Sequence, residues 1–128
     1  MLPFGKTEDG LMNFENSLFT EPLLVGIIFI IAGLIMLKFP PKKINMLYGY
    51  RTLSSMKNQK NWDFAQRYSS ILMMYCGFGL LLFSGIGLLF TVSTGQGVLI
   101  STIALFATVG VLIYFTEKAI KQNNKDEE

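Results

Sequence analysis

The sequence contains no histidine, and its 128 residues include a single cysteine, Cys76, which lies within an apolar run. Without histidine, the chain cannot build histidine zinc sites, serine–histidine catalytic groups or histidine-based pH switches. One cysteine cannot close an intramolecular disulfide, so disulfides do not stabilise this fold. We therefore expect no metal site and no cofactor.

Charged residues are scarce and unevenly placed. They make up 16% of the chain, against 51% hydrophobic residues, and segments 22–37 and 71–115 contain none. The net charge of +2 is too small to indicate a nucleic-acid partner. Long apolar segments free of charge are typical of a small integral membrane protein, whose lipid-facing surface needs no polar side chains.

Three apolar segments, 22–39, 71–92 and 98–115, have the length of membrane spans. At about 1.5 Å per residue they reach roughly 27–33 Å as helices, close to the hydrocarbon thickness of about 30 Å. The polar, glycine-rich segment 93–97 separates the last two and predicts a tight helical hairpin. None of the spans has an ionisable residue in its interior, which argues against a proton-coupled transporter.

These features predict a single all-α membrane domain, residues 1–128, with three transmembrane helices, the last two forming the hairpin. All eleven lysines and arginines except Lys6 lie in segments 38–70 and 116–128. The positive-inside rule therefore predicts that the N-terminus lies outside and the C-terminus inside. In chain order we expect an extracytoplasmic flank (1–21), a first span (22–39), a cytoplasmic loop (40–70) with a short interfacial helix at about 59–70, the second and third spans (71–92, 98–115), and a cytoplasmic tail (116–128).

Small residues recur at spacings that suit helix contacts within the membrane. Gly26 and Gly33 are seven residues apart, as are Gly77 and Ser84. Because lipid is as apolar as leucine, membrane helices associate through close packing at small residues. We interpret these positions as contact seams, either within one chain or between chains of a homo-oligomer.

The loop collects most of the polar chemistry. Lys42 and Lys43 follow the first span and are expected to contact lipid headgroups. Gly49 allows a backbone turn with positive φ. The guanidinium of Arg51 could hold a lipid phosphate, a helix C-terminal carbonyl or Asp63.

The end of the loop has the pattern of a helix start. A helix that starts after Asn58, rather than earlier in the loop, has Asp63 near the positive end of its dipole. Asn58 is therefore the favoured N-cap. Trp62 and Ala65 then share one helix face, with Trp62 either in that face or serving as an aromatic anchor at the membrane interface. Asp63 and Arg67 are four residues apart and are expected to pair.

Along the loop the chain reads Asn45, then Gly49-Tyr50-Arg51-Thr52, Ser55-Met56-Lys57-Asn58 and Trp62-Asp63-Phe64-Ala65-Gln66. This pattern resembles the signature of a known family, the SdpI-like integral membrane proteins. That family is named for an immunity protein that protects bacteria from their own sporulation-delaying toxin. The resemblance is close over about residues 44–92, and it corresponds to the C-terminal unit of longer members. The binding or signature residues that it marks are Asn45, Gly49, Tyr50, Arg51, Thr52, Ser55, Asn58, Trp62 and Ala65.

Three hypotheses follow. The resemblance implies a non-enzymatic protein of the bacterial cytoplasmic membrane that gives immunity to a membrane-active peptide toxin and signals to a cytoplasmic regulator. The basic loop alternatively suggests a protein that binds lipid headgroups or polyprenyl phosphate. The glycine seams suggest a third class, a structural subunit that assembles with other membrane proteins.

Overall fold

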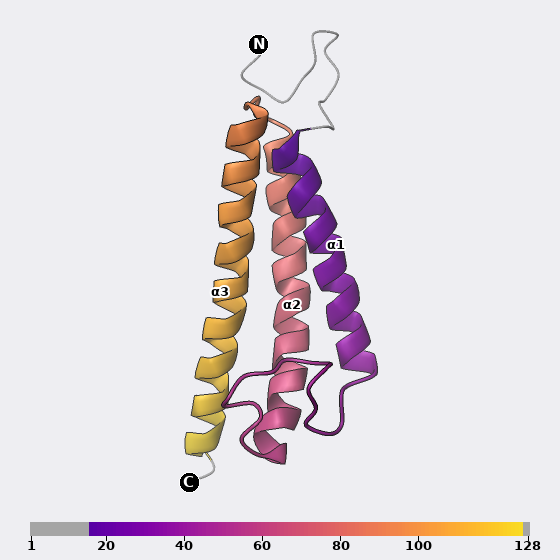
Figure 1. Ribbon diagram of the computed structural model, residues 1–128, viewed down its shortest axis with the longest axis vertical. Coiled ribbons are helices and arrows are strands. Elements are labelled where there is room, and N and C mark those ends of the chain that lie inside the picture. Colours follow the sequence, from indigo (N-terminus) through magenta and orange to yellow (C-terminus); the bar gives the residue numbers. More distant parts are fainter. Residues whose placement is uncertain (1–15, 127–128) are drawn as a thin grey trace.

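A computed structural model describes residues 16–126 and shows three helices and no strand within that range (Figure 1). These are α1 (Ser17–Lys38), α2 (Gln59–Gly87) and α3 (Thr94–Asp126). Each is long and apolar enough to cross a membrane, which confirms the all-α class and the three spans. Residues 1–15 of the expected extracytoplasmic flank, and residues 127–128 of the tail, lie outside the described part.

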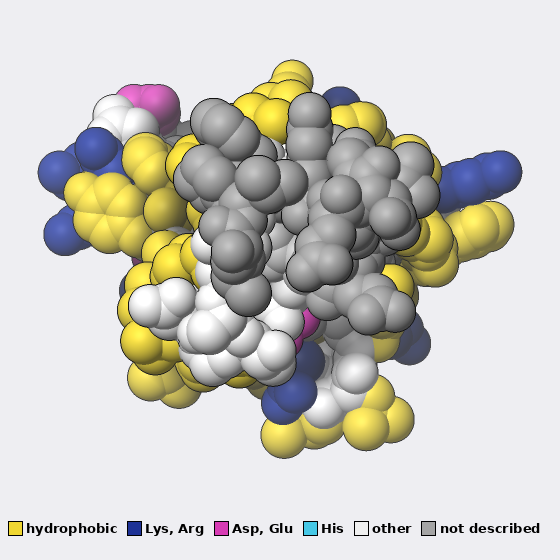
Figure 2. All heavy atoms as spheres, turned by 90° about the horizontal axis from the view of Figure 1, so that it is seen from above, with side chains coloured by type: hydrophobic (Ala, Val, Ile, Leu, Met, Phe, Trp, Pro, Cys, Tyr) yellow, Lys and Arg dark blue, Asp and Glu magenta, His cyan; other side chains and the backbone are white. Residues whose placement is uncertain are grey.

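The helices run side by side with alternating direction, so the α1–α2 connection and the end of α3 lie at the same end of the bundle (Figure 1). Seen along the bundle axis, hydrophobic side chains project outward on most sides (Figure 2). Residues such as Leu24, Leu82 and Phe106 are 61%, 71% and 74% exposed. Such exposure suits lipid rather than water as the solvent.

Glycines bring α1 and α2 into close contact. A Cβ built on Gly26 would lie 2.8 Å from the carbonyl oxygen of Gly77, and one built on Gly77 would lie 2.7 Å from that of Gly26. Gly33 lies as tightly against Ser70, whose carbonyl oxygen would be 2.7 Å from a Cβ. The Ser84 hydroxyl donates to the carbonyl of Phe19 at 2.8 Å. The expected seam positions thus pack within one chain, and we call this contact the α1–α2 seam.

Polar side chains define where the helices begin. Asn58 caps α2, its side-chain oxygen accepting from the backbone N–H of Asn61 at 2.8 Å, which confirms the expected N-cap. Asn16 caps α1 and also donates to the carbonyl of Gly87 at 3.0 Å, joining the start of α1 to the end of α2.

α3 begins at Thr94, inside the segment expected to form the turn, because Ser93 and Gln96 cap it reciprocally. The connection between α2 and α3 is therefore residues 88–93.

Two helices extend well beyond the membrane-spanning length. At about 1.5 Å per residue α1 is roughly 33 Å long, whereas α2 reaches about 43 Å and α3 about 50 Å. In α2 and α3 the additional length lies at the end of the bundle where α1 ends. There the start of α2 and the end of α3 enclose the connection (Figure 1). We call this region, residues 39–70 and 116–126, the polar cap. Residues 59–70, expected as a short interfacial helix, are the first turns of α2 and continue into its apolar part without a break.

Candidate functional site in the polar cap

Gly49 turns the connection against a buried amide on α2. Its φ is 108°, and a Cβ at this position would lie 2.5 Å from Oε1 of Gln66. The turn lets the backbone N–H of Tyr50 donate to that oxygen at 2.6 Å, while Nε2 of Gln66 donates to the Tyr50 carbonyl at 2.8 Å. Gln66 is 1% exposed and pairs with the backbone much as a neighbouring strand would. The positive φ expected at Gly49 is confirmed, and its role is to permit this contact.

Three hydroxyls of the connection converge on a carboxylate from α3. The Tyr50 hydroxyl donates to Oε2 of Glu117 at 2.7 Å, and Oγ1 of Thr52 donates to the same oxygen at 2.9 Å. The Ser54 hydroxyl donates to Oε1. Hydrogen bonds to an ionised acceptor are stronger than neutral ones, so this cluster fastens the connection to α3.

The cluster shifts the acidity of both titrating partners. Burial raises the pKa of Glu117, but the hydrogen bonds from Ser54, Tyr50 and Thr52 favour the carboxylate and bring its pKa below the usual value. The pKa of Tyr50 is raised, first by burial and then by its hydrogen bond to the negative Glu117. At neutral pH this pair therefore consists of a neutral phenol and a carboxylate.

Thr52 and Ser55 close a tight turn within the connection. The backbone N–H of Thr52 donates to Oγ of Ser55 at 2.8 Å, and the Ser55 hydroxyl, 0% exposed, lies 3.1 Å from the Thr52 carbonyl. Asn61, in the first turn of α2, donates from Nδ2 to the carbonyl of Ser54 at 2.9 Å. The turn is thus held from within and from α2.

Trp62 anchors the start of the connection. Its side chain is 0% exposed, and its indole Nε1 donates to the carbonyl of Pro41 at 2.6 Å. Ala65, one turn further along the same face, is also fully buried. Trp62 is therefore a core residue of the cap, and its interpretation as an exposed aromatic anchor is wrong.

Asn45 organises the exposed part of the connection. Its Oδ1 accepts from the backbone N–H groups of Leu47 at 2.9 Å and Tyr48 at 2.7 Å, and its Nδ2 donates to the carbonyl of Lys43 at 2.9 Å. Such bonds to nearby backbone are the usual way in which asparagine stabilises a turn. Asn45 thus shapes the loop, whereas the side chains of Lys42 and Lys43 are exposed.

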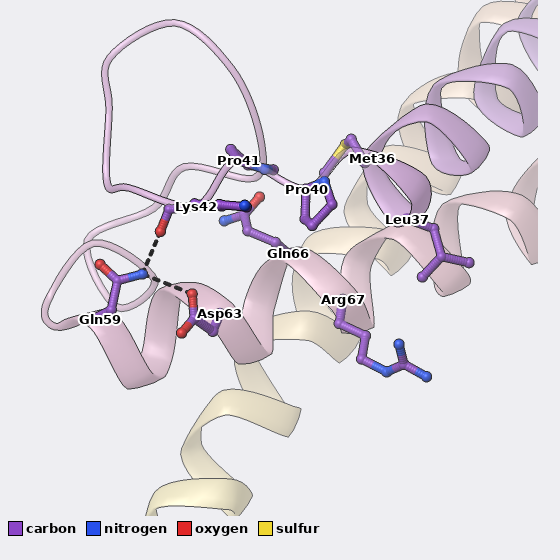
Figure 3. Close-up of a pocket in the computed structure, with 9 residues that line it drawn as sticks. All are labelled: Met36, Leu37, Pro40, Pro41, Lys42, Gln59, Asp63, Gln66 and Arg67. Atoms are coloured by element: carbon purple, nitrogen blue, oxygen red, sulfur yellow. Dashed lines mark hydrogen bonds between the residues drawn. The ribbon is translucent and has the colours of Figure 1, made fainter.

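Arg51 is presented outward rather than paired. Within residues 16–126 its guanidinium contacts only the sulfur of Met46, at 3.8 Å, so the expected bonds to Asp63 or to a helix C-terminal carbonyl are not formed. Asp63 instead accepts from Nε2 of Gln59 at 2.7 Å. The expected ion pair between Asp63 and Arg67 is not formed, because the Arg67 side chain extends away from Asp63 (Figure 3).

Two residues that build the site were missed in the sequence. Gln66 belongs to the motif around Trp62 but carries no signal of its own, because an amide suits an exposed helix face equally well. Glu117 was missed because it lies 63 residues beyond Ser54. One signal could have found it: it is the first charged residue after the uncharged segment 71–115, and an acid at the start of a basic tail.

Comparison with known proteins places this site within a matched region. A model of the SdpI/YfhL protein family matches residues 42–115. The uncharacterized protein YfhL of Bacillus subtilis (strain 168) is 42% identical over 100 residues, which cover 77% of this chain and 84% of that protein. No solved structure matches the chain. The matched region begins at Lys42, so it contains the connection from there on, and it ends two residues before Glu117.

Proposed function

This chain belongs to the SdpI/YfhL protein family, and from that premise we propose that it is an immunity protein that protects a bacterial cell against a membrane-active peptide toxin. In this proposal it acts by binding and not by catalysis. The observation that supports it best is that the signature residues build one internally bonded cap. Tyr50, Thr52 and Ser55 hold the connection in place, while Arg51 is left free for a partner.

We place the protein in the cytoplasmic membrane, with the N-terminus outside and the polar cap inside. The charge distribution supports this orientation, since every lysine and arginine except Lys6 lies in segment 38–70 or in the tail. The toxin would then be met within the bilayer or at its outer side, and the cap would be its cytoplasmic readout.

The outer surface of the connection is suited to a cytoplasmic regulator. Leu47 and Leu53 are each 95% exposed, and Arg51 lies between them in sequence. Exposed apolar side chains that lie together mark interaction sites, and arginine is enriched among the residues that dominate the binding energy of protein contacts. Signalling would follow from a change in how firmly the cap holds this surface.

Deletion of the gene followed by complementation tests the immunity role. Cells carrying wild-type protein, Arg51→Ala or Lys57→Ala would be challenged with a panel of membrane-active peptides, including those secreted by the source bacterium. We expect deletion and Arg51→Ala to reduce survival by about tenfold or more for at least one peptide. Lys57→Ala, which removes another exposed charge of the same loop, should protect normally.

Membrane abundance of each variant would be measured by immunoblot, so that loss of protein is not mistaken for loss of protection. Unchanged survival of the deletion strain against every peptide would refute the proposal. Equal loss of protection in both variants would show that only the overall charge of the loop matters.

A further inference from the structure

A cavity of about 360 Å³ opens where α1 ends and α2 begins (Figure 3). One wall is apolar and consists of Met36, Leu37, Pro40 and Pro41. The rest of the lining is polar and consists of Lys42 from the connection and of Gln59, Asp63, Gln66 and Arg67 from α2. The volume is within the range of small-molecule sites. Its two-sided lining is suited to an amphipathic ligand.

The cavity lies at the expected level of the lipid headgroups. Met36 and Leu37 belong to the last turn of α1, whose length of about 33 Å is close to the hydrocarbon thickness. Directly before them in the chain, Leu34 and Ile35 are each 48% exposed and offer an outward apolar surface to acyl chains. A lipid of the surrounding bilayer can therefore place its headgroup in the cavity without leaving the membrane.

Two cations in the polar wall have no partner for their charge. Within residues 16–126, neither the Lys42 ammonium nor the Arg67 guanidinium makes a hydrogen bond or an ion pair. In Figure 3 Lys42 lies beside Gln66, whereas Arg67 extends from α2 away from Asp63, so its guanidinium would turn toward the cavity to share a ligand with Lys42. The carboxylate between them, Asp63, is already engaged by Gln59. The lining therefore carries a net charge of about +1, which one phosphodiester would neutralise.

Backbone and amide contacts keep the cavity open. Gln59 bridges its two sides, donating from Nε2 to the carbonyl of Lys42 at 2.6 Å and to Asp63. The indole N–H of Trp62 donates to the carbonyl of Pro41 and so fixes the position of Pro41 in the lining. The walls are thus positioned by the same anchors that order the polar cap, and only the two cations are free to move.

We propose that this cavity binds the phosphodiester headgroup of a membrane phospholipid, with Lys42 and Arg67 as the phosphate ligands and the end of α1 as the surface for its glycerol and acyl chains. The site uses different residues from the exposed surface around Arg51. It does not depend on the immunity role, and binding can be measured without any toxin.

Native mass spectrometry of the full-length protein in detergent tests this site, with phosphatidylglycerol as the titrated probe. We expect the double variant Lys42→Gln/Arg67→Gln to lower the affinity by at least about tenfold. The matched control, Lys57→Gln/Lys121→Gln, removes the same charge from exposed positions outside the cavity and should remain within about twofold of wild type. Circular dichroism should show equal helicity in all three proteins, because these side chains are exposed.

Two further arms separate the possible sources of affinity. Diacylglycerol with the same acyl chains lacks the phosphate and should not be retained. Inorganic phosphate at equal concentration should not displace the lipid, because it cannot contact the apolar wall. Equal loss in the control variant, retention of diacylglycerol as strong as that of phosphatidylglycerol, or displacement by inorganic phosphate would each overturn the proposal.

Discussion

The α1–α2 seam and the polar cap are parts of one bundle held together by different means. In the seam, Gly26 and Gly77 let two backbones approach to distances that no side chain permits. In the cap, polar groups such as the buried amide of Gln66 and the partly buried carboxylate of Glu117 are matched to donors of the connection. Within lipid, helices are stabilised mainly by close packing. Next to water, the folded chain is stabilised by burial of apolar surface and by directed hydrogen bonds.

The difference shows how a short membrane protein can hold a precise surface. The seam depends on the small volume of its glycines and not on any polar group of theirs, since a Cβ at these positions would meet backbone atoms. The cap depends on particular hydrogen-bond donors and acceptors, such as those of Gln66 and Glu117. Substitutions in the two regions should therefore destabilise the protein for different physical reasons, and four substitutions distinguish these reasons.

Trp62→Ala should have the largest effect, in the cap. It removes a fully buried aromatic side chain and leaves the Pro41 carbonyl without its donor. We expect a loss of about 3–5 kcal/mol in the free energy of unfolding. Unfolding in detergent would measure it, with the exposed Tyr75→Ala on the same helix as the control. A loss below about 1 kcal/mol would show that the indole is not a core element.

Gly77→Val tests the seam by volume alone. The added side chain meets the carbonyl oxygen of Gly26 and the side chain of Ile30, so we expect a loss of about 1–3 kcal/mol from overpacking. Gly79→Val is the matched control, because a Cβ at Gly79 meets nothing within 4 Å. Similar losses in both variants would mean that backbone propensity, and not the seam, is responsible.

Glu117→Gln tests the cap by charge alone. It replaces the ionised acceptor of three hydroxyls with a neutral one, and we expect a loss of about 1–2 kcal/mol at pH 7. Hydrogen exchange should rise in residues 50–56 and stay unchanged across the α1–α2 seam. Increased exchange in both regions would show that the two parts are not separable.

The contribution of Glu117 should also depend on pH. Its pKa is lower in the folded protein than in the unfolded chain, so its stabilisation is fully present above the unfolded value of about 4.3 and is lost as the pH falls through the folded value. The difference between wild type and Glu117→Gln should therefore shrink as the pH is lowered from 7 toward about 3. A constant difference would exclude a role for the charge.

Asn58→Ala should have the smallest effect, about 1 kcal/mol, because it removes one hydrogen bond at the start of α2. Asn58→Asp, which keeps the accepting oxygen, is the control and should remain near wild type. Equal losses of stability in both variants would indicate that the side-chain amide of Asn58, and not its accepting oxygen at the helix N-cap, stabilises the protein.

Much of the fold could be predicted because its causes are local. Charge-free apolar segments predicted three spans, and the spacing of Gly26, Gly33, Gly77 and Ser84 predicted contact seams, which the structure places between α1 and α2 of one chain. Helix ends were less accurate. α3 begins at Thr94 because Ser93 and Gln96 cap it, a pattern overlooked within a glycine-rich segment.

The sequence by itself determined the three helices, the clustering of positive charge at one end and the cap at Asn58, since each depends on neighbours along the chain. Only the tertiary structure decided that the hydroxyls of Tyr50 and Thr52 donate to Glu117, and that Arg51 makes no ion pair within residues 16–126. The physical reason is distance along the chain. These contacts exist because the seam and the antiparallel hairpin return the end of α3 to the connection, and no local pattern records which carboxylate arrives there.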